Sequence, residues 1–122
     1  MEKGHSMNRI YEQTMLFDFY GELLTEHQRA VYTDALYNDM SLGEIAEERG
    51  ISRQGVHDMI KRCDKILLGY EKKLHLVERF VKEKAAVKEI CELSKAEDAA
   101  EGEAFYRLRR IGELSQKLLG EL

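Results

Sequence analysis

The polar side chains between residues 53 and 65 have the types and the spacing of a nucleic-acid-binding helix. Arginine and glutamine form hydrogen bonds with base edges, and arginine and lysine bind backbone phosphates. The predicted binding residues are Arg53, Gln54, His57, Lys61, Arg62 and Lys65. On one helix, the first four lie at the leading end and outer face, and the last two would contact phosphate. The alternative is a solvated helix face on a scaffold that makes protein contacts.

The local charge around these residues is basic, although the chain as a whole has a net charge of -4 at pH 7. Residues 8–50 carry three arginines against nine acidic residues, and this segment would repel phosphate. Residues 52–73 carry six basic residues against three acidic ones. Asp58 and Gly55 weaken the case for DNA, because a carboxylate repels phosphate and glycine lowers helix propensity by about 1 kcal/mol.

Other chemistry is not indicated by the sequence. The four histidines lack metal-ligand spacing, and there is no glycine-rich phosphate loop or nucleophile elbow, so we predict no enzyme, no metal and no cofactor. Cys63 and Cys91 are outside any CxxC spacing, which is typical of reduced thiols in a cytoplasmic protein. No apolar run approaches the roughly 18 residues that cross a bilayer, so no membrane partner is expected.

Two short helices joined by a tight turn would position the candidate site. Ser41 opens a capping box before a helix over residues 42–49, and Gly50 supplies the left-handed turn that ends it. Ser52 caps the next helix. The apolar residues that would face inward are Ile45, Ala46, Ile51, Val56 and Ile60. The pattern predicts a helix-turn-helix over residues 42–68, whose second helix can lie in a DNA major groove.

The remaining segments also predict helices, and with no proline and 34% charged residues the chain has the composition of an all-α protein. We predict a disordered leader over residues 1–7 and a helical domain over residues 8–80. Residues 81–122 would form a helical extension that packs on the domain or on a dimer partner. The dense apolar pattern from Ile10 to Leu24 predicts a helix buried on most sides.

A long helix is predicted after the turn, because its apolar residues alternate steps of four and three. They are Met59, Cys63, Leu67, Tyr70, Leu74, Val77 and Val81. This seam could pack on the N-terminal helices or on a second copy of the chain, and the periodicity leaves both open. Our hypothesis is a homodimer. A last amphipathic helix, from Phe105 to Leu122, also needs a partner surface.

The segment LTEHQRAVYTDALYNDMSLGEIAEERGISRQGVHDMIKR resembles the region-four DNA-binding module of bacterial sigma factors. A closer resemblance is to the YlxM family, through MLFDFYGELLTEHQ, SLGEIAEERGISRQGVHDMIKR and ILLGYEKKL in that order, from Met7 to Phe80. The family pattern is matched at Ser52, Arg53, Gln54, Val56, Asp58, Ile60, Lys61 and Arg62. Gly55, His57 and Met59 stand where the family usually has alanine, tyrosine and asparagine.

The resemblance implies a small bacterial cytosolic protein, encoded beside the signal recognition particle GTPase and its receptor, that regulates this targeting pathway. Our first hypothesis is therefore a regulator that binds the particle's RNA or its GTPase through the basic helix. The second is a dimeric transcriptional regulator that reads DNA with Arg53, Gln54 and His57. A third is an interaction module whose binding face is the C-terminal helix.

Overall fold

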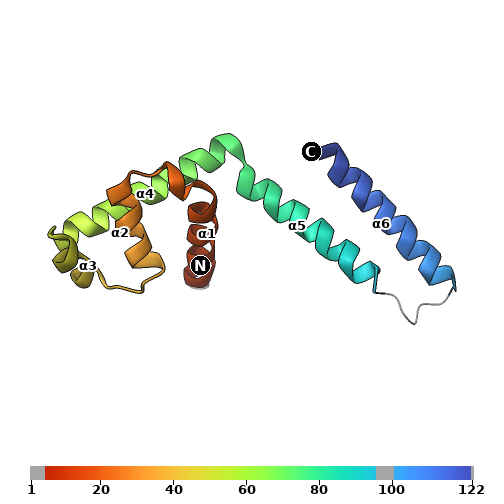
Figure 1. Ribbon diagram of the computed structural model, residues 1–122, viewed down its shortest axis with the longest axis horizontal. Coiled ribbons are helices and arrows are strands. Elements are labelled where there is room, and N and C mark those ends of the chain that lie inside the picture. Colours follow the sequence, from red (N-terminus) through yellow and green to blue (C-terminus); the bar gives the residue numbers. More distant parts are fainter. Residues whose placement is uncertain (1–4, 96–100, 122) are drawn as a thin grey trace. The chain divides into compact units, whose positions relative to one another are not determined.

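The computed structural model describes residues 5–95 and 101–121, and every regular element in these ranges is a helix (Figure 1). The elements are α1 (His5–Tyr20), the 3-10 helix η1 (Gly21–Leu23), α2 (Glu26–Leu36), α3 (Leu42–Arg49), α4 (Arg53–Leu74), α5 (Leu76–Leu93) and α6 (Glu101–Glu121). The predicted all-α class is confirmed. The helices belong to two units, residues 1–77 and 78–122. No helix within the described ranges is long and apolar enough to cross a membrane.

The predicted disordered leader, residues 1–7, overlaps the start of α1, and the predicted domain bounds stay predictions. Helix α1 begins at His5, so residues 5–7 belong to its first turn, and residues 1–4 lie outside the described residues. Residues 5–7 contain neither glycine nor proline. A helix nucleated further along the chain therefore extends through them at little cost.

The local signals around the turn are confirmed in the first unit. The Thr25 hydroxyl accepts a hydrogen bond from the Gln28 backbone N–H at 3.2 Å, and both reciprocal bonds of a capping box are present. Ser41 and Glu44 form a second capping box at the start of α3. Gly50 has a φ of 71°, the left-handed conformation expected at the end of that helix. These features fix where α2 and α3 begin and where the chain turns into α4.

An apolar cluster under the turn holds α3 against α4. Its buried members are Val31, Ile45, Ala46 and Val56. Ile51 and Ile60 are partly buried and pack against them. The residues predicted to face inward therefore do so. Since β-branched and small side chains fill the contact, the two helices approach closely and the orientation of α4 is set by packing.

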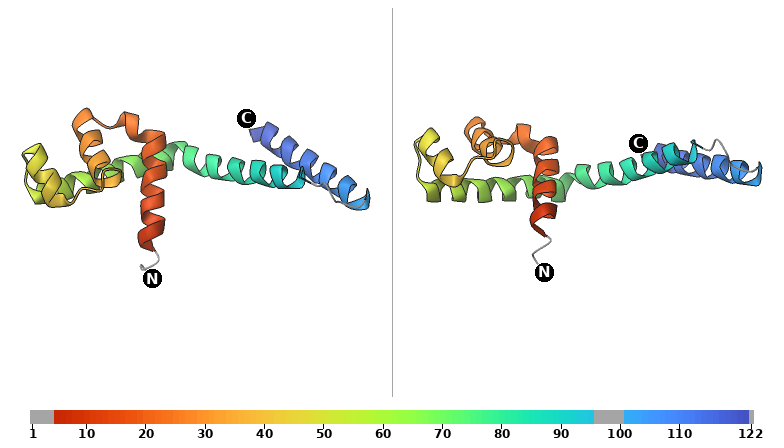
Figure 2. Two further views of the ribbon diagram at one scale, coloured as in Figure 1. Left: turned by 60° about the horizontal axis from the view of Figure 1, so that its bottom comes forward. Right: turned by 90° about the horizontal axis from the view of Figure 1, so that it is seen from below.

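Helix α1 lies across the C-terminal half of α4 (Figure 2). Its residues Leu16 and Tyr20 are buried in a second cluster, and the remaining buried members are Leu24, Tyr32, Cys63 and Leu67. The prediction that this helix is buried on most sides is wrong, because Ile10 and Tyr11 are more than half exposed. Only one face of α1 packs against α4 and α2. The apolar side chains of α1 that lie outside this face therefore remain exposed to solvent.

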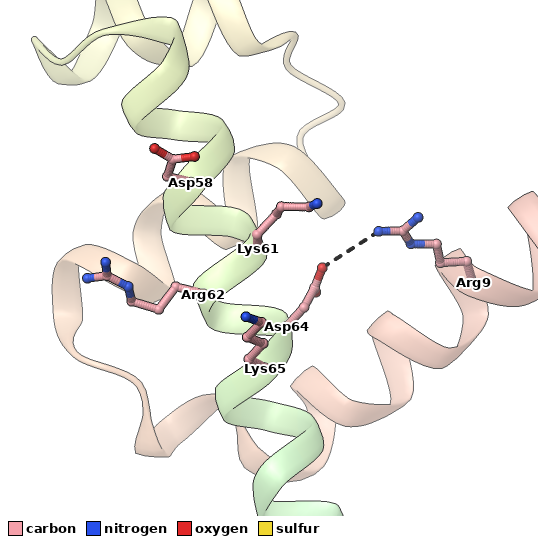
Figure 3. Close-up of a pocket in the computed structure, with 6 residues that line it drawn as sticks. All are labelled: Arg9, Asp58, Lys61, Arg62, Asp64 and Lys65. Atoms are coloured by element: carbon pink, nitrogen blue, oxygen red, sulfur yellow. Dashed lines mark ion pairs between the residues drawn. The ribbon is translucent and has the colours of Figure 1, made fainter.

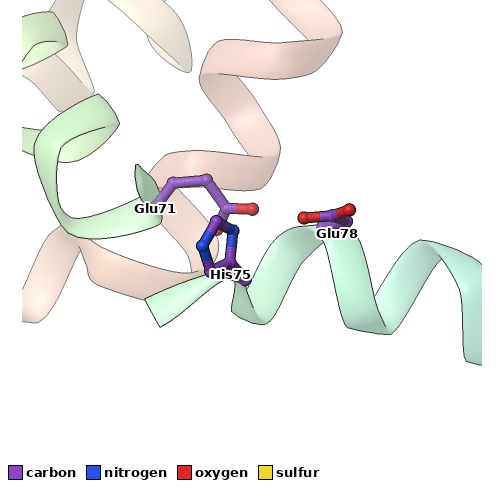
Figure 4. Close-up of side chains that lie close together, drawn as sticks. All are labelled: Glu71, His75 and Glu78. Carbon is purple, nitrogen blue, oxygen red and sulfur yellow. The ribbon is translucent and has the colours of Figure 1, made fainter. Parts of the chain in front are cut away.

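The predicted long helix is interrupted at His75. Helix α4 ends at Leu74, and His75 takes the left-handed conformation with a φ of 55° before α5 begins at Leu76. Figure 4 shows His75 beside Glu71 at this break. The prediction of one continuous seam to Val81 is therefore wrong.

Side chains from α1 and α4 hold the break in place. The buried Tyr20 hydroxyl donates to Glu71 Oε1 at 2.6 Å and accepts from the Leu76 backbone N–H at 3.1 Å. Glu71 Oε1 also accepts from the Val77 N–H at 3.0 Å. The first N–H groups of a helix lack partners within it, so these acceptors stabilise a new helix start at residue 76.

The second unit contains α6 and α5 from Glu78 onward, and the two helices run antiparallel (Figure 1). Arg110 Nε of α6 lies 3.1 Å from Glu89 Oε2 of α5. Among the described residues of this unit, Leu114 is the buried apolar side chain. Several large apolar side chains are exposed: Phe80, Val81, Val87, Phe105, Tyr106, Leu108 and Leu119. That residues 81–122 pack on the first unit or on a second copy stays a prediction.

Candidate nucleic-acid interface

One face of helix α4 is buried and the opposite face carries the predicted binding residues. Val56, Cys63 and Leu67 have no exposed surface, and their helical spacing places them on one side. The six predicted residues are all exposed: Arg53, Gln54, His57, Lys61, Arg62 and Lys65. The structure does not, however, bring all six into one cluster.

The first turns of α4 are occupied by contacts within the protein. Gln54 Nε2 donates to Asp58 Oδ1 at 3.0 Å, and His57 Nδ1 lies 3.8 Å from the same oxygen. The Arg53 side chain extends toward Gly43 at the start of α3. Its Nε lies 3.8 Å from the position that a Cβ atom on Gly43 would occupy. Asp58 thus engages two of the three side chains predicted to read bases.

The middle of α4 forms the wall of an open hollow of about 430 Å3. Its lining residues are Arg9, Asp58, Lys61, Arg62, Asp64 and Lys65 (Figure 3). Lys61 and Asp64 extend from α4 toward Arg9 on α1, whereas Arg62 extends from the other side of the helix. Four cations against two carboxylates make this the basic part of the candidate site, and Arg9 was missed from the sequence.

The three α4 cations of the hollow are available for a ligand. Within the described ranges, Lys61, Arg62 and Lys65 form no hydrogen bond or ion pair. Several other basic residues are paired: Arg29 with Glu22, Arg49 with Asp34, and Arg110 with Glu89 and Glu113. An unpaired cation keeps its full attraction for phosphate, because no internal contact must be broken first.

Asp64, the carboxylate nearest Arg9, is already held by other donors. The Tyr32 hydroxyl donates to its Oδ1, and Gln13 Nε2 lies 3.0 and 3.3 Å from its two oxygens. Burial, together with the Asp64 hydrogen bond, raises the pKa of Tyr32, so this hydroxyl stays a proton donor. Arg9 Nη2 is further away, at 4.0 Å from Oδ2. Asp64 therefore does not depend on Arg9 as its partner.

Comparison with known sequences agrees with this helix-turn-helix. The family model described as "Putative helix-turn-helix protein, YlxM / p13 like" matches residues 7–104, which include every residue of the hollow. The chain belongs to the UPF0122 family. The resemblance to YlxM proteins inferred from the sequence is thereby confirmed, as is the helix-turn-helix fold.

Curated relatives carry the same family name. A UPF0122 protein of Acetivibrio thermocellus is 50% identical over 84 residues, which are 69% of this chain and 72% of that protein. A UPF0122 protein of Desulforamulus reducens is 37% identical over 113 residues, which are 93% of this chain and 95% of that protein. A UPF0122 protein of Clostridium botulinum is 54% identical over 68 residues, 56% of this chain and 62% of that protein.

The helix-turn-helix of this UPF0122 protein is fixed by a buried ion pair between α2 and α3. Asp34 is 5% exposed, and its Oδ2 accepts from Arg49 Nε at 3.0 Å and from Nη2 at 2.8 Å. Asn38 Nδ2 donates to Oδ1 at 2.9 Å. The Arg49 hydrogen bonds, and to a lesser extent Asn38, lower the pKa of Asp34 despite its burial. The pair therefore holds α3 in the position against which α4 packs.

A sequence signal for Arg9 exists in this UPF0122 protein, but it points to packing. Arg9, Gln13, Leu16 and Tyr20 follow one another at steps of four, three and four, so they share one face of α1. Leu16 and Tyr20 are buried, and Gln13 reaches Asp64. Arg9 continues this face beyond the apolar core. Recognising its role needs the crossing of α1 over α4, which local sequence does not specify.

Proposed function

We propose that this protein is a non-enzymatic regulator in the signal recognition particle pathway that binds the particle's RNA through α4. The observation that carries the proposal is the row of unpaired cations on the middle of this helix, Lys61, Arg62 and Lys65. Such cations bind phosphate and leave base identity largely unread. The assignment to the targeting pathway rests on the resemblance to YlxM proteins. It includes a cytoplasmic location and no cofactor.

Recognition of an RNA backbone fits this face better than sequence-specific reading of DNA bases does. Double-stranded RNA is recognised mostly through its shape, its phosphates and its 2′-hydroxyls, which suits lysine and arginine side chains. Reading DNA bases requires free side chains at the leading end of the recognition helix. Here Gln54 and His57 both contact Asp58, an exposed carboxylate that also repels phosphate.

A dimeric DNA-binding regulator is the second candidate, favoured by the exposed first turn of α4. Two helix-turn-helix units would then bind half-sites one helical turn apart. The homodimer is part of this second proposal. The GTPase of the particle, as an alternative protein partner, is part of the first proposal. These alternatives predict different ligands, and one binding experiment separates them.

The experiment compares three ligands for the purified full chain at near-physiological salt. They are the reconstituted particle RNA, the particle GTPase and a random pool of duplex DNA. RNA binding that weakens about tenfold in the Lys61→Glu variant, with a smaller loss for Arg53→Glu, is the expected result. Lys88→Glu is the matched control, because Lys88 is an exposed lysine on α5.

Each other outcome contradicts part of the proposal. Enrichment of one duplex sequence by the wild type, lost in Arg53→Glu, would replace the RNA-binding regulator with a transcription factor. Capture of the GTPase alone would remove RNA as the ligand. If Lys61→Glu binds RNA as the wild type does while Lys88→Glu binds more weakly, α4 is not the binding surface and the second unit becomes the candidate.

A further inference from the structure

The hollow between α1 and α4 has a feature that the helix-turn-helix alone does not provide. Arg9 comes from α1, outside the motif, and faces the Lys61 side of α4 (Figure 3). Its side chain is 65% exposed, so it is held by neither burial nor close packing. A guanidinium opposite two lysines can bind an oxyanion from several sides.

The crossing of α1 over α4 determines where Arg9 lies. Tyr20 and Glu71 form a hydrogen bond at one end of the crossing, and Gln13 and Asp64 form one about two turns of α1 earlier. Arg9 is one further turn toward the start of α1, on the same face. Because these two hydrogen bonds and the apolar core fix the crossing, Arg9 is directed to the level of Lys61 and Lys65 on α4.

Arg9 can leave Asp64 at little cost. Its separation from Asp64, 4.0 Å, is at the upper limit for an ion pair, and exposed pairs of this kind contribute little stability. Asp64 keeps the Tyr32 and Gln13 hydrogen bonds when Arg9 moves. The carboxylate thus holds the guanidinium near the hollow without competing strongly with a phosphate.

We propose that Arg9, Lys61 and Lys65 together bind one backbone phosphate of a nucleic acid, as a clamp that spans α1 and α4. This inference rests on the proposed function and adds a residue outside the helix-turn-helix to its binding surface. An open hollow suits a phosphate that belongs to a polymer, because the strand must enter and leave it. The strand would continue along the exposed face of α4. Arg62 serves the neighbouring phosphate on the other side of the helix.

The test is the salt dependence of RNA binding by the full chain. Labelled particle RNA is titrated with wild type, Arg9→Gln and Arg29→Gln at several salt concentrations. Each phosphate contact contributes about 0.9 to the slope of log affinity against log salt, or about 0.7 on a single strand. We expect Arg9→Gln to bind about five- to tenfold more weakly at low salt. The slope should also fall, by less than one full contact, because Lys61 and Lys65 still hold the same phosphate.

Arg29→Gln is the matched control, since Arg29 is a partly exposed arginine of the first unit paired with Glu22. It should keep the wild-type slope. Arg9→Lys retains the charge without the planar fork and should recover most of the slope but less of the affinity. Circular dichroism and thermal unfolding of Arg9→Gln should match the wild type, because Arg9 is outside the core.

The outcomes separate this inference from the proposed function. A wild-type slope in Arg9→Gln, with a reduced slope in Lys61→Glu, overturns the clamp and leaves the proposed function intact. No RNA binding by the wild type overturns both. Inorganic phosphate that binds the protein alone and competes at millimolar concentration would indicate a free-anion site instead. A loss confined to GTPase binding would indicate an acidic protein surface as the ligand.

Discussion

Replacing Arg49 with methionine should strongly destabilise the first unit, although Arg49 lies outside the apolar core. The substitution removes two hydrogen bonds to Asp34 and leaves its buried carboxylate with Asn38 alone. Breaking a buried ion pair by removing one partner costs about 3–5 kcal/mol. The Arg49 side chain is 33% exposed, and solvent screening reduces the expected loss to about 2–3 kcal/mol.

Urea unfolding followed by circular dichroism measures this loss as a shift in midpoint at constant slope. Arg29→Met is the control, because its partner Glu22 is 93% exposed and such surface pairs are worth at most about 1 kcal/mol. The double variant Asp34→Asn with Arg49→Met removes the uncompensated charge and should recover part of the stability. Equal losses for Arg49→Met and Arg29→Met would refute the reasoning.

The same pair predicts a pH dependence. The pKa of Asp34 is lower in the folded protein than its ordinary value of 3.8. The stabilisation is therefore complete above that value and is lost as the pH falls through the lower, folded pKa. The stability difference between wild type and Arg49→Met should then shrink in acid. A difference that stays constant down to about pH 2 would show that Asp34 is not the group involved.

Three further predictions concern other positions of the fold. Gly50→Ala should cost about 1–2 kcal/mol in urea unfolding, because alanine is strained at a φ of 71° even though no atom lies within 4 Å of its Cβ. Thiol titration of the native protein at pH 8 should detect Cys91 rapidly and Cys63 only on unfolding, since Cys63 is buried and burial raises its pKa to about 11. Tyr20→Phe should lose about 1–3 kcal/mol and speed amide exchange at Leu76, whose N–H would lose its acceptor; unchanged exchange would contradict this role.

Features that depend on a few neighbouring residues could be predicted from the sequence. The capping boxes at Thr25 and Ser41 close within four residues, and the left-handed turn at Gly50 depends on one residue. The inward positions of the helix-turn-helix follow from helical periodicity. These local signals agree with one another, and the structure has the same helix starts.

Features that depend on tertiary contact could not be predicted in this way. The break at His75 interrupts an apolar seam whose spacing continues past it, and its stabilising acceptors include Tyr20, more than fifty residues earlier. A periodic pattern reports which face is apolar, but not whether a distant hydroxyl will accept the N–H groups of a new helix. Arg9 was missed for the same reason, since its neighbour Asp64 is 55 positions away in the chain.

The two carboxylates of α4 that would repel phosphate differ in what surrounds them, and this difference bears on which nucleic acid fits. Asp58 is 62% exposed and contacts Gln54 and His57, so its charge lies among the side chains that would read bases. Asp64 is 27% exposed and receives hydrogen bonds from Tyr32 and Gln13, which offset its charge beside Lys61 and Lys65. The leading end of α4 is thus unfavourable for base reading, while its middle is favourable for phosphate. This difference supports the proposed function, in which the surface would recognise the backbone shape of a folded RNA and not a DNA sequence.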